Sequence, residues 1–287
     1  MKVSIIIPTY NRFNKLANLL NSLIPQIREH GLEINLEVLI VDDHSDCVAD
    51  KQMNYLLDKK YSFLRLYSLD RNRGPSFARN YGLSQSTGDI IIFLDDDCIV
   101  ERNYILETIR VHKEHPEVMV LNGNLKRLRD DFYSNFWFYN YDAVFNKKDS
   151  RLYRVNRLSS GNFSIKRTLL RMINPLFDES LPSREDYDLY LRLQENGIDL
   201  YKSDDIIAYL DCRDSLVGLI KQRVWYTKGE YYIRRKYGEE FIIADEKKHK
   251  VDIRQHSHFL AILLGFSWRL SMKYWKLRDM IKMRNLL

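Results

Sequence analysis

Cysteine is scarce in this 287-residue chain, and its three copies, Cys47, Cys98 and Cys212, are scattered. The lack of a CxxC pair or a Cys/His cluster argues against a structural zinc site, and three isolated thiols do not suggest a disulfide framework. We therefore expect a reducing compartment. Long apolar runs are also missing, because no stretch reaches the ~20 apolar residues that a membrane-spanning helix needs. The first ten residues, MKVSIIIPTY, predict a strand rather than a signal peptide.

Acidic residues are scarce only in the last quarter of the chain. The whole sequence carries 45 Lys+Arg and 39 Asp+Glu, a formal net charge of +6. Residues 216–287 hold 16 of the basic and 7 of the acidic residues, so this segment alone has a net charge of +9. The basic character therefore belongs to the tail. Because the chain has no nucleic-acid recognition motif, we expect no nucleic-acid partner.

Short apolar runs alternate with helical patterns in the first hundred residues. The runs are 3–7, 37–41, 63–68 and 90–94, and helices are expected around the leucines of 16–23 and over 76–86. Strands that alternate with helices predict an α/β fold with a mostly parallel sheet. Asn14 is expected to cap the first helix, and Gly88 to end the second in the left-handed conformation.

Polar segments follow three of these runs directly. They are Pro8 and Thr9, then Asp42 and Asp43, then Asp95, Asp96 and Asp97. Ligands of parallel sheets bind beyond the carboxyl ends of the strands, so these segments are expected to converge on one edge. Adjacent carboxylates at the edge of a core repel one another unless a cation neutralises them, and oxygen ligands suit a hard divalent metal. An isolated acidic triplet is commonly a solvated turn, but the buried strand before it favours a metal site.

Aromatic residues and a further acidic pair distinguish the second half. The segment FYSNFWFYNYDAVF places eight aromatics in residues 132–145, either as a helix that completes the core or as a wall of an acceptor pocket. SREDYDLYLRLQENG predicts a helix with Glu185 and Asp186 in its first turn, where the helix dipole favours carboxylates. From this local pattern alone, helix capping explains the two acids equally well.

Six stretches, taken in order, resemble one family. They are VSIIIPTYNR, VLIVDDHSD, NRGPSFARNYGL, TGDIIIFLDDDCIV, SSGNFSIKR and REDYDLYLRL. Together they resemble the inverting glycosyltransferases of family 2, which have the GT-A fold, over roughly residues 1–215. The resemblance implies a Rossmann-like, mostly parallel sheet flanked by helices, with a nucleotide-binding half at about 1–100 and an acceptor half at about 101–215. Residues 216–287 would then form a basic, amphipathic helical extension.

The resemblance also implies a nucleotide-sugar donor. The corresponding nucleotide-binding residues are Pro8, Thr9, Tyr10, Arg12, Asp42, Asp43, Arg79, Asp95 and Asp96. A carboxylate at this position can accept a hydrogen bond from N3–H of uracil, so UDP is the favoured carrier. The DDD segment resembles the DxD motif of the family, in which Asp97, and with it Asp95, would bind Mn²⁺ or Mg²⁺. Arg79 is equally well explained as a buried ion-pair partner of one of these acids.

Asp186 resembles the catalytic base of the family, with Glu185 beside it. The expected reaction is the attack of an acceptor hydroxyl on the anomeric carbon, so the base must take the hydroxyl proton. One base acting from one face inverts the anomeric configuration. The alternatives are a nucleotidyltransferase and a non-catalytic nucleotide-sugar-binding protein. The former normally has a glycine-rich phosphate loop after its first strand, and PTYNR has no glycine.

Some positions depart from the family pattern. Many relatives carry a histidine after the strand that follows the acidic pair, whereas this chain reads IIAYLDCRD, with Asp211 as the best oxygen ligand. Processive synthases have an arginine directly followed by a tryptophan, whereas in the QRVW sequence at 222–225 a valine separates these two residues. This difference favours transfer of single sugars. Weaker candidates for acceptor or diphosphate contacts are Gly161, Asn162, Arg223, Tyr226 and Lys228.

The last helix, expected at roughly 256–285, carries one apolar stripe beside many basic residues. The stripe consists of Phe259, Leu263, Phe266, Leu270, Tyr274, Leu277 and Ile281. It would pack on the catalytic domain or in a homodimer, or it would lie on an anionic membrane with Trp268 and Trp275 as anchors. The membrane interpretation fits a glycan or lipid-linked saccharide acceptor in bacterial surface polysaccharide synthesis. It predicts a cytoplasmic protein, peripheral on the inner face of the cell membrane.

Overall fold

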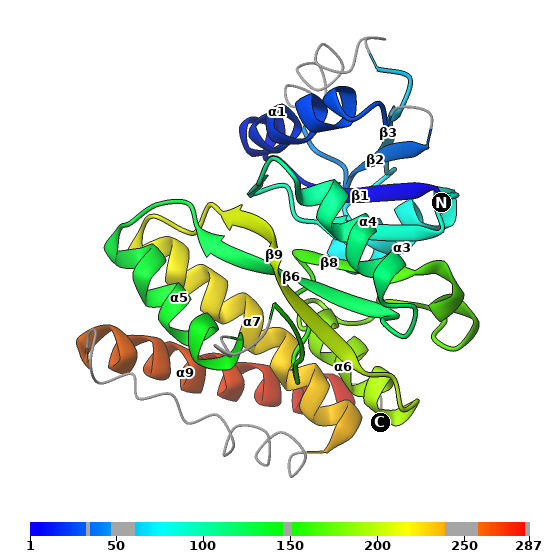
Figure 1. Ribbon diagram of the computed structural model, residues 1–287. Coiled ribbons are helices and arrows are strands. Elements are labelled where there is room, and N and C mark those ends of the chain that lie inside the picture. Colours follow the sequence, from blue (N-terminus) through cyan, green and yellow to red (C-terminus); the bar gives the residue numbers. More distant parts are fainter. Residues whose placement is uncertain (33–34, 47–60, 146–150, 239–257, 285–287) are drawn as a thin grey trace. The chain divides into compact units, whose positions relative to one another are not determined.

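The computed structural model describes residues 1–287 apart from 33–34, 47–60, 146–150, 239–257 and 285–287 (Figure 1). The chain divides into two compact units. Unit 1 comprises Met1–Leu128, Lys147–Glu179 and Asp186–Asp211, and unit 2 comprises Arg129–Asn146, Ser180–Glu185 and Cys212–Leu287. Unit 1 ends close to the boundary expected at residue 215. Unit 2 also takes in the aromatic segment, which the sequence had grouped with the catalytic domain.

Unit 1 is built on one mixed sheet with the strand order β3-β2-β1-β4-β8-β6-β9-β5, and β7 pairs with β9. The strands are β1 (Val3–Thr9), β2 (Leu36–Asp42), β3 (Leu64–Ser68), β4 (Ile90–Leu94), β5 (Cys98–Val100), β6 (Val120–Arg127), β7 (Leu152–Arg154), β8 (Asn162–Lys166) and β9 (Leu200–Leu210). Strands β1 to β4 form a parallel block, and β6 and β9 are also parallel. Strand β8 joins these groups as an antiparallel neighbour of β4 and β6. The predicted α/β architecture is confirmed.

Helices cover both faces of this sheet (Figure 1). They are α1 (Phe13–Glu29), α3 (Pro75–Gln85), α4 (Tyr104–Glu114), the short 3-10 helix η1 (Arg167–Arg171) and α6 (Glu185–Glu195). On one face, Phe93 of β4 and Phe163 of β8 share a hydrophobic cluster with Leu189 of α6. Side chains alternate along a strand, so Asn162 and Ser164 of β8 point to the other face. There they bond to residues of α4, which covers that side.

Two predicted helix ends are wrong. Helix α1 begins after Arg12, which makes no side-chain cap bond, so Asn14 is not the N-cap. Helix α3 ends at Gln85, and Ser86 is already extended. Glycine is needed at Gly88 for another reason, because a Cβ atom there would lie 2.5 Å from the backbone nitrogen of Ser4. Close approach of β1, and not a left-handed turn, explains this glycine.

His112 of α4 is a buried histidine with two hydrogen-bond partners. Its Nε2 lies 2.8 Å from Ser164 Oγ, and its Nδ1 lies 3.3 Å from the Val118 carbonyl oxygen. Burial, assisted by the positive charge of Lys166, lowers the pKa of His112 to about 4. The folded protein therefore keeps this ring neutral at pH values where an unfolded chain protonates it.

We expect this histidine to destabilise the fold in mild acid. Below about pH 6.5, the pKa of an unperturbed histidine, the unfolded chain binds a proton at His112 that the folded chain does not bind. The free energy of unfolding therefore falls as pH drops from about 6.5 towards 4. Between pH 7 and pH 5 the His112 contribution amounts to about 2 kcal/mol. Urea denaturation of wild type and His112→Gln at both pH values measures it. The variant should lose less stability than wild type. His115→Gln, which replaces a partly exposed histidine, is the control. Parallel curves for wild type and His112→Gln would contradict the expectation.

Unit 2 contains three described helices, α5 (Phe132–Phe145), α7 (Leu216–Tyr237) and α9 (His258–Arg284). Phe136 of α5 packs on Leu219 of α7 in a small cluster, which supports the core interpretation of the aromatic segment. Helix α9 is held on α7 by polar contacts: Trp268 Nε1 donates to Glu230 Oε2 over 3.0 Å, and the Tyr231 hydroxyl donates to Asp279 Oδ2 over 3.0 Å. No helix in the described part of the chain is both long and apolar enough to span a bilayer.

The two tryptophans expected to anchor α9 in a membrane have another role. Trp268 is bound to Glu230 of α7, as noted above, and the ammonium of Lys228 on α7 lies 5.1 Å from the centre of the Trp275 ring. Both side chains are only partly exposed. They therefore take part in the contact between α7 and α9, and their role as membrane anchors remains a prediction.

Candidate active site

The carboxyl ends of β1, β2 and β4 meet at one edge of the sheet. Thr9 of β1 pairs with Asp42 of β2, and Ile6 of β1 pairs with Phe93 of β4. Three residues further along, Thr9 therefore lies beside Asp96, which follows β4. The Thr9 hydroxyl donates to Asp96 Oδ2 over 2.8 Å, and the Asp43 amide donates to the Thr9 carbonyl over 2.9 Å. The convergence predicted from the three strand ends is confirmed.

Asp95, the first acid after β4, is fixed by a buried cation. Arg79 of α3 donates from Nη2 to Asp95 Oδ1 over 2.6 Å, and its guanidinium lies 5.5 Å from the centre of the Phe177 ring. Because the Arg79 side chain is only 3% exposed, the ion-pair interpretation of this residue is the one that the structure supports. Gly161 packs closely against the Asp95 carboxylate, since a Cβ atom at this position would lie 2.7 Å from Asp95 Oδ2.

Asp96 and Asp97 share a single cationic nitrogen. Arg12 Nη1 lies 3.1 Å from Asp96 Oδ1 and 3.1 Å from Asp97 Oδ2. Burial raises the pKa of Asp96, against the opposing effects of Arg12 and the Thr9 hydroxyl. Burial, and then the charges of Asp95 and Asp96, raise the pKa of Asp97 to about 7, although Arg12 and Lys15 act in the opposite direction. The acids are thus costly to ionise without more positive charge nearby.

These carboxylates fit a divalent metal that takes most of its ligands from elsewhere. Mg²⁺ and similar ions are commonly held by one or two protein carboxylates together with substrate phosphates and water. Asp96 Oδ1 and Asp97 Oδ2 already face one cation, so their oxygens supply such a donor pair. Among the described residues, no group of three His, Cys, Asp or Glu side chains is arranged to hold a metal.

Asp211 does not complete a set of three metal ligands. Its carboxylate is paired with Lys15 of α1, whose Nζ lies 3.0 Å from Oδ2, and the same ammonium also donates to the Asp211 carbonyl over 3.0 Å. Asp95 is likewise committed to Arg79. The expected set Asp95, Asp97 and Asp211 is therefore not formed in this structure. The Asp211 amide instead donates to the Asp97 carbonyl over 2.8 Å and helps to fix the acidic loop.

Asp42 and Asp43 are buried and shape two loops. Asp43 accepts hydrogen bonds from the backbone amides of Arg73 and Gly74, each over 2.7 Å. Gly74 permits this turn with a φ of +89°. Asp42 accepts from the backbone amide of Ser45 over 3.2 Å. The binding of Asp43 to the Arg73–Gly74 backbone was missed from the sequence, although the glycine in DRNRGP indicated an unusual turn.

The other expected donor residues lie near these loops. Pro8 is buried within β1, whereas the Tyr10 side chain just beyond it is 46% exposed. Asn11 has a φ of +52° and donates from its amide to Ser45 Oγ over 2.8 Å, which turns the chain into α1. The nucleotide-binding roles of Pro8 and Tyr10 remain predictions.

Glu185 and Asp186 open helix α6. The Tyr187 amide donates to Asp186 Oδ1 over 2.8 Å, as expected for an acid in the first turn of a helix. Two residues on, the fully buried Asp188 pairs with Arg192 over 2.8 Å, and Arg192 also donates to the Pro175 and Leu176 carbonyls. Asp188 thereby ties α6 to the preceding loop, a role that the sequence pattern did not reveal. The Glu185 side chain is buried, whereas Asp186 is partly exposed.

The weaker candidates have structural contacts of their own. Asn162 is completely buried, and its side chain accepts from the Tyr104 hydroxyl over 2.7 Å, which is a structural role. A contact of Asn162 with an acceptor or diphosphate remains a prediction. Arg223, Tyr226 and Lys228 lie on α7 in unit 2. The Arg184 guanidinium lies 4.8 Å from the centre of the Tyr226 ring. Roles of these three residues toward a diphosphate remain predictions.

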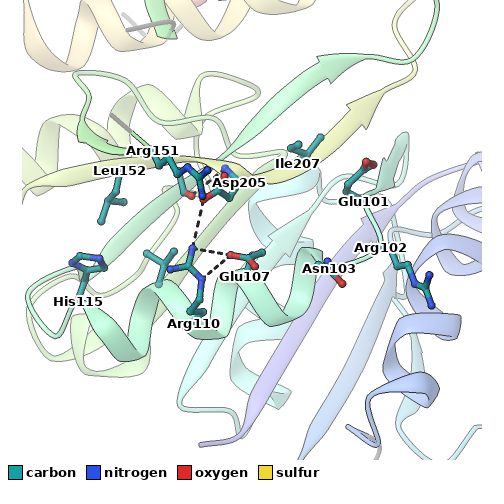
Figure 2. A pocket seen from close by; sticks show the side chains of 12 residues that line it. Glu101, Arg102, Asn103, Glu107, Arg110, His115, Arg151, Leu152, Asp205 and Ile207 are labelled. Atoms are coloured by element: carbon teal, nitrogen blue, oxygen red, sulfur yellow. Dashed lines mark hydrogen bonds and ion pairs between the residues drawn. The ribbon is translucent and has the colours of Figure 1, made fainter. Parts of the chain in front are cut away.

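A separate hollow of about 540 Å³ is lined by residues of α4, β7 and β9 and of the loops next to α4 and β7 (Figure 2). Figure 2 shows Arg110 between Glu107 and Asp205. The Arg110 Nη2 atom lies 2.8 Å from Glu107 Oε2 and 3.5 Å from Asp205 Oδ2. None of the acids at the ends of β1, β2 and β4 lines it. The acidic edge of the sheet, where the polar ends of three strands converge, is the better candidate for chemistry.

Comparison with known proteins identifies the family of this chain. Residues 4–173 match the model of "Glycosyl transferase family 2". A dolichyl N-acetyl-alpha-D-glucosaminyl phosphate 3-beta-D-2,3-diacetamido-2,3-dideoxy-beta-D-glucuronosyltransferase of Methanococcus voltae is 25% identical over 82% of this chain and 74% of its own length. The poly(ribitol-phosphate) beta-N-acetylglucosaminyltransferase TarS of Staphylococcus aureus is 25% identical over 88% of this chain, which spans only 43% of TarS.

A solved structure confirms the fold. The mannosyltransferase PcManGT from Pyrobaculum calidifontis, in complex with GDP-Man and Mn²⁺, superposes with a TM-score of 0.62 at 17% identity, over 94% of this chain and 72% of that one. At this identity the likeness establishes the fold alone. The family match covers more than half of the chain and includes the acids that follow β2 and β4. The chain belongs to glycosyl transferase family 2 and has the GT-A fold.

Proposed function

We propose that this protein is an inverting, metal-dependent glycosyltransferase that moves one sugar from a nucleotide-sugar to a glycan or lipid-linked glycan. The observation that carries the proposal is the pair of carboxylates, Asp96 and Asp97, that face one cation at the carboxyl end of β4. In a family 2 glycosyltransferase, such a pair suits a metal-bound diphosphate. A UDP-linked donor is supported by the relationship to TarS, which has been solved in complex with UDP and with UDP-GlcNAc.

Asp97, helped by Asp96, would hold Mn²⁺ or Mg²⁺. When bound, the ion would stabilise the negative charge that develops on the leaving diphosphate. Arg79 would act indirectly, because it is buried and holds Asp95 in place. Thr9 would orient Asp96 through its 2.8 Å hydrogen bond. The structure of a relative with Mn²⁺, PcManGT, supports a divalent metal in this fold.

Asp186 would be the general base. An acceptor hydroxyl oxygen forms a bond to the anomeric carbon while the bond from that carbon to the diphosphate oxygen breaks, and the diphosphate leaves with the bonding electrons. The hydroxyl proton passes to the Asp186 carboxylate. The partial exposure of Asp186 at the first turn of α6 would leave it accessible to an acceptor. Attack from the face opposite the leaving group inverts the anomeric configuration.

A panel of nucleotide-sugars tests the donor class. The thermal unfolding temperature of the protein is measured with UDP-, GDP- and other nucleotide-linked sugars, each with Mn²⁺. We expect stabilisation by at least one UDP-sugar, since ligands that bind only the folded state raise its stability. Stabilisation by GDP-sugars alone would contradict the assignment of UDP, and no stabilisation by any donor would contradict the proposed function.

We also propose that the acceptor is held at a membrane and that α9 binds the surface of this membrane. Four apolar side chains of α9 are between 52% and 59% exposed: Phe266, Leu270, Tyr274 and Leu277. At about 100° per residue they fall within a sector of roughly 80°. The exposed Arg269, Lys273 and Lys276 lie along one side of this sector. Apolar side chains flanked by cations suit the interface of an anionic bilayer, so we assign α9 to the inner face of the cell membrane.

The substitution Leu270→Glu should weaken binding to vesicles that contain anionic lipid. Removal of one buried leucine costs about 1.5–3 kcal/mol, which corresponds to a fall in the partition coefficient of roughly tenfold or more. Flotation of wild type and variant with phosphatidylglycerol vesicles measures this. Met172→Glu, which alters an equally exposed apolar side chain of unit 1, is the matched control. If Leu270→Glu floats like wild type but changes from dimer to monomer in light scattering, the stripe is a subunit interface.

A further inference from the structure

Arg12 lies between Asp96 and Asp97, the two carboxylates proposed to hold a metal ion. One nitrogen of its guanidinium, Nη1, lies at 3.1 Å from a carboxylate oxygen of each acid. The Asp96 and Asp97 side chains are only 4% and 14% exposed, so they have little water to stabilise their charges. Arg12 is the cation that contacts both carboxylates, whereas Arg79 is bound to Asp95 and Lys15 to Asp211.

The backbone of Arg12 is fixed, whereas its side chain has room to move. The Arg12 carbonyl accepts hydrogen bonds from the amides of Lys15 and Leu16, each over 3.0 Å, and so belongs to the first turn of α1. Asn11 before it is held to Ser45. The Arg12 side chain is 34% exposed, and arginine has several rotatable bonds. Rotation of the side chain alone can therefore withdraw the guanidinium from the acids.

From this geometry we infer that Arg12 is an internal counterion that makes metal binding depend on the donor nucleotide. The inference rests on the proposed metal-dependent function. A divalent ion that binds Asp97 Oδ2 meets the Arg12 charge at the same oxygen, and like charges at this distance repel strongly in a partly buried site. A metal ion that binds without nucleotide must displace the Arg12 guanidinium, and it supplies no new hydrogen-bond acceptor for that group. A nucleoside diphosphate brings phosphate oxygens that accept the displaced guanidinium in charge-assisted hydrogen bonds.

Metal and nucleotide are then coupled through one side chain. Each raises the affinity of the other by the same factor, because coupling between two binding equilibria is reciprocal. Arg12 is a positioning residue in this account, since it weakens the binding of metal in the free protein and steadies the diphosphate in the complex. The arrangement would keep the acids from holding an ion before the donor arrives.

The test compares Mn²⁺ and UDP binding by calorimetry in wild type and in Arg12→Gln. Without nucleotide, Arg12→Gln should bind Mn²⁺ about tenfold more tightly than wild type. With Mn²⁺ present, it should bind UDP more weakly, so the coupling factor between metal and UDP falls about tenfold or more. Arg12→Lys keeps the positive charge and should bind Mn²⁺ alone as weakly as wild type. Arg102→Gln, an exposed arginine of the same unit paired with Glu29, is the control and should change neither affinity.

Each outcome decides the inference. Equal or weaker binding of Mn²⁺ alone by Arg12→Gln would overturn the counterion role while leaving the metal-dependent function intact, provided that wild type still shows coupling. Tight binding of Mn²⁺ by Arg12→Lys would overturn it as well, because the charge would then be irrelevant. If wild type binds Mn²⁺ neither alone nor with UDP, the proposed metal site fails and the inference fails with it.

Discussion

Replacement of Asp186 by asparagine is expected to lower the turnover of sugar transfer about 10²–10⁴-fold. The amide has nearly the shape of the carboxylate but cannot accept the proton of the acceptor hydroxyl. The binding of UDP should stay close to wild type, because the nucleotide is assigned to the edge formed by β1, β2 and β4. Initial rates at saturating donor, together with calorimetric titration of UDP, separate the two effects.

The control for this variant lies on the same helix. Glu195→Gln makes the same carboxylate-to-amide change at the exposed last residue of α6 and should leave turnover unchanged. Near-normal kcat in Asp186→Asn would falsify the assignment of the base. If Asp186→Asn also loses its unfolding transition, the loss of kcat reflects a loss of the fold. Asp186→Ser, which can still cap the helix, then tests the base, and it should retain the fold but not the activity. Retained activity in Asp186→Ser would show that the acid serves the helix instead.

Replacement of Asp97 by alanine is expected to abolish the effect of metal on nucleotide binding. In wild type, Mn²⁺ should raise the affinity for UDP by tenfold or more, within the usual range for coupled sites. Without the Asp97 carboxylate the ion loses a principal protein ligand, so the UDP affinity should become similar with and without Mn²⁺. The measurement is calorimetric titration of UDP into each protein in the presence of Mn²⁺ and in the presence of EDTA.

A surface acid provides the comparison for Asp97. Asp199→Ala removes a carboxylate of unit 1 that pairs with the exposed Arg154, and it should retain the full effect of metal. An Asp97→Ala protein in which Mn²⁺ still strengthens UDP binding as much as in wild type would exclude Asp97 as a metal ligand. Asp96 would then be the remaining carboxylate next to Arg12.

The position of the site was predictable because strand ends can be read from the sequence. The run before Asp95 is fully apolar and the run before Asp42 is apolar apart from Glu37, and parallel pairing with β1 brings their carboxyl ends together. The ends of helices were harder to predict from the sequence. Asn14 and Gly88 have the residue types that caps prefer, yet the start of α1 is set by the loop that Asn11 forms with Ser45, and Gly88 is needed for close packing on Ser4.

The partners of the acids could not be predicted, because they depend on where side chains point in space. Lys15 and Asp211 are far apart in the sequence, and no local pattern links them. The same is true of the contact of Arg12 with Asp96 and Asp97, since the motif indicates only a nucleotide-binding role for this arginine. Asn162 was placed near an acceptor by its position after Gly161, but strand alternation turns its side chain into the core beneath α4.

The central claim is that the acidic edge of the sheet, with Asp186, transfers a sugar from a metal-bound nucleotide-sugar. The most direct test measures release of the nucleoside diphosphate by the full chain, with UDP-sugars as donors, a lipid extract as the source of acceptor, and Mn²⁺. The account predicts release that depends on the extract, stops when EDTA is added and resumes when Mn²⁺ is restored. Release that continues unchanged in EDTA, or binding of UDP-sugars without any release, would contradict it.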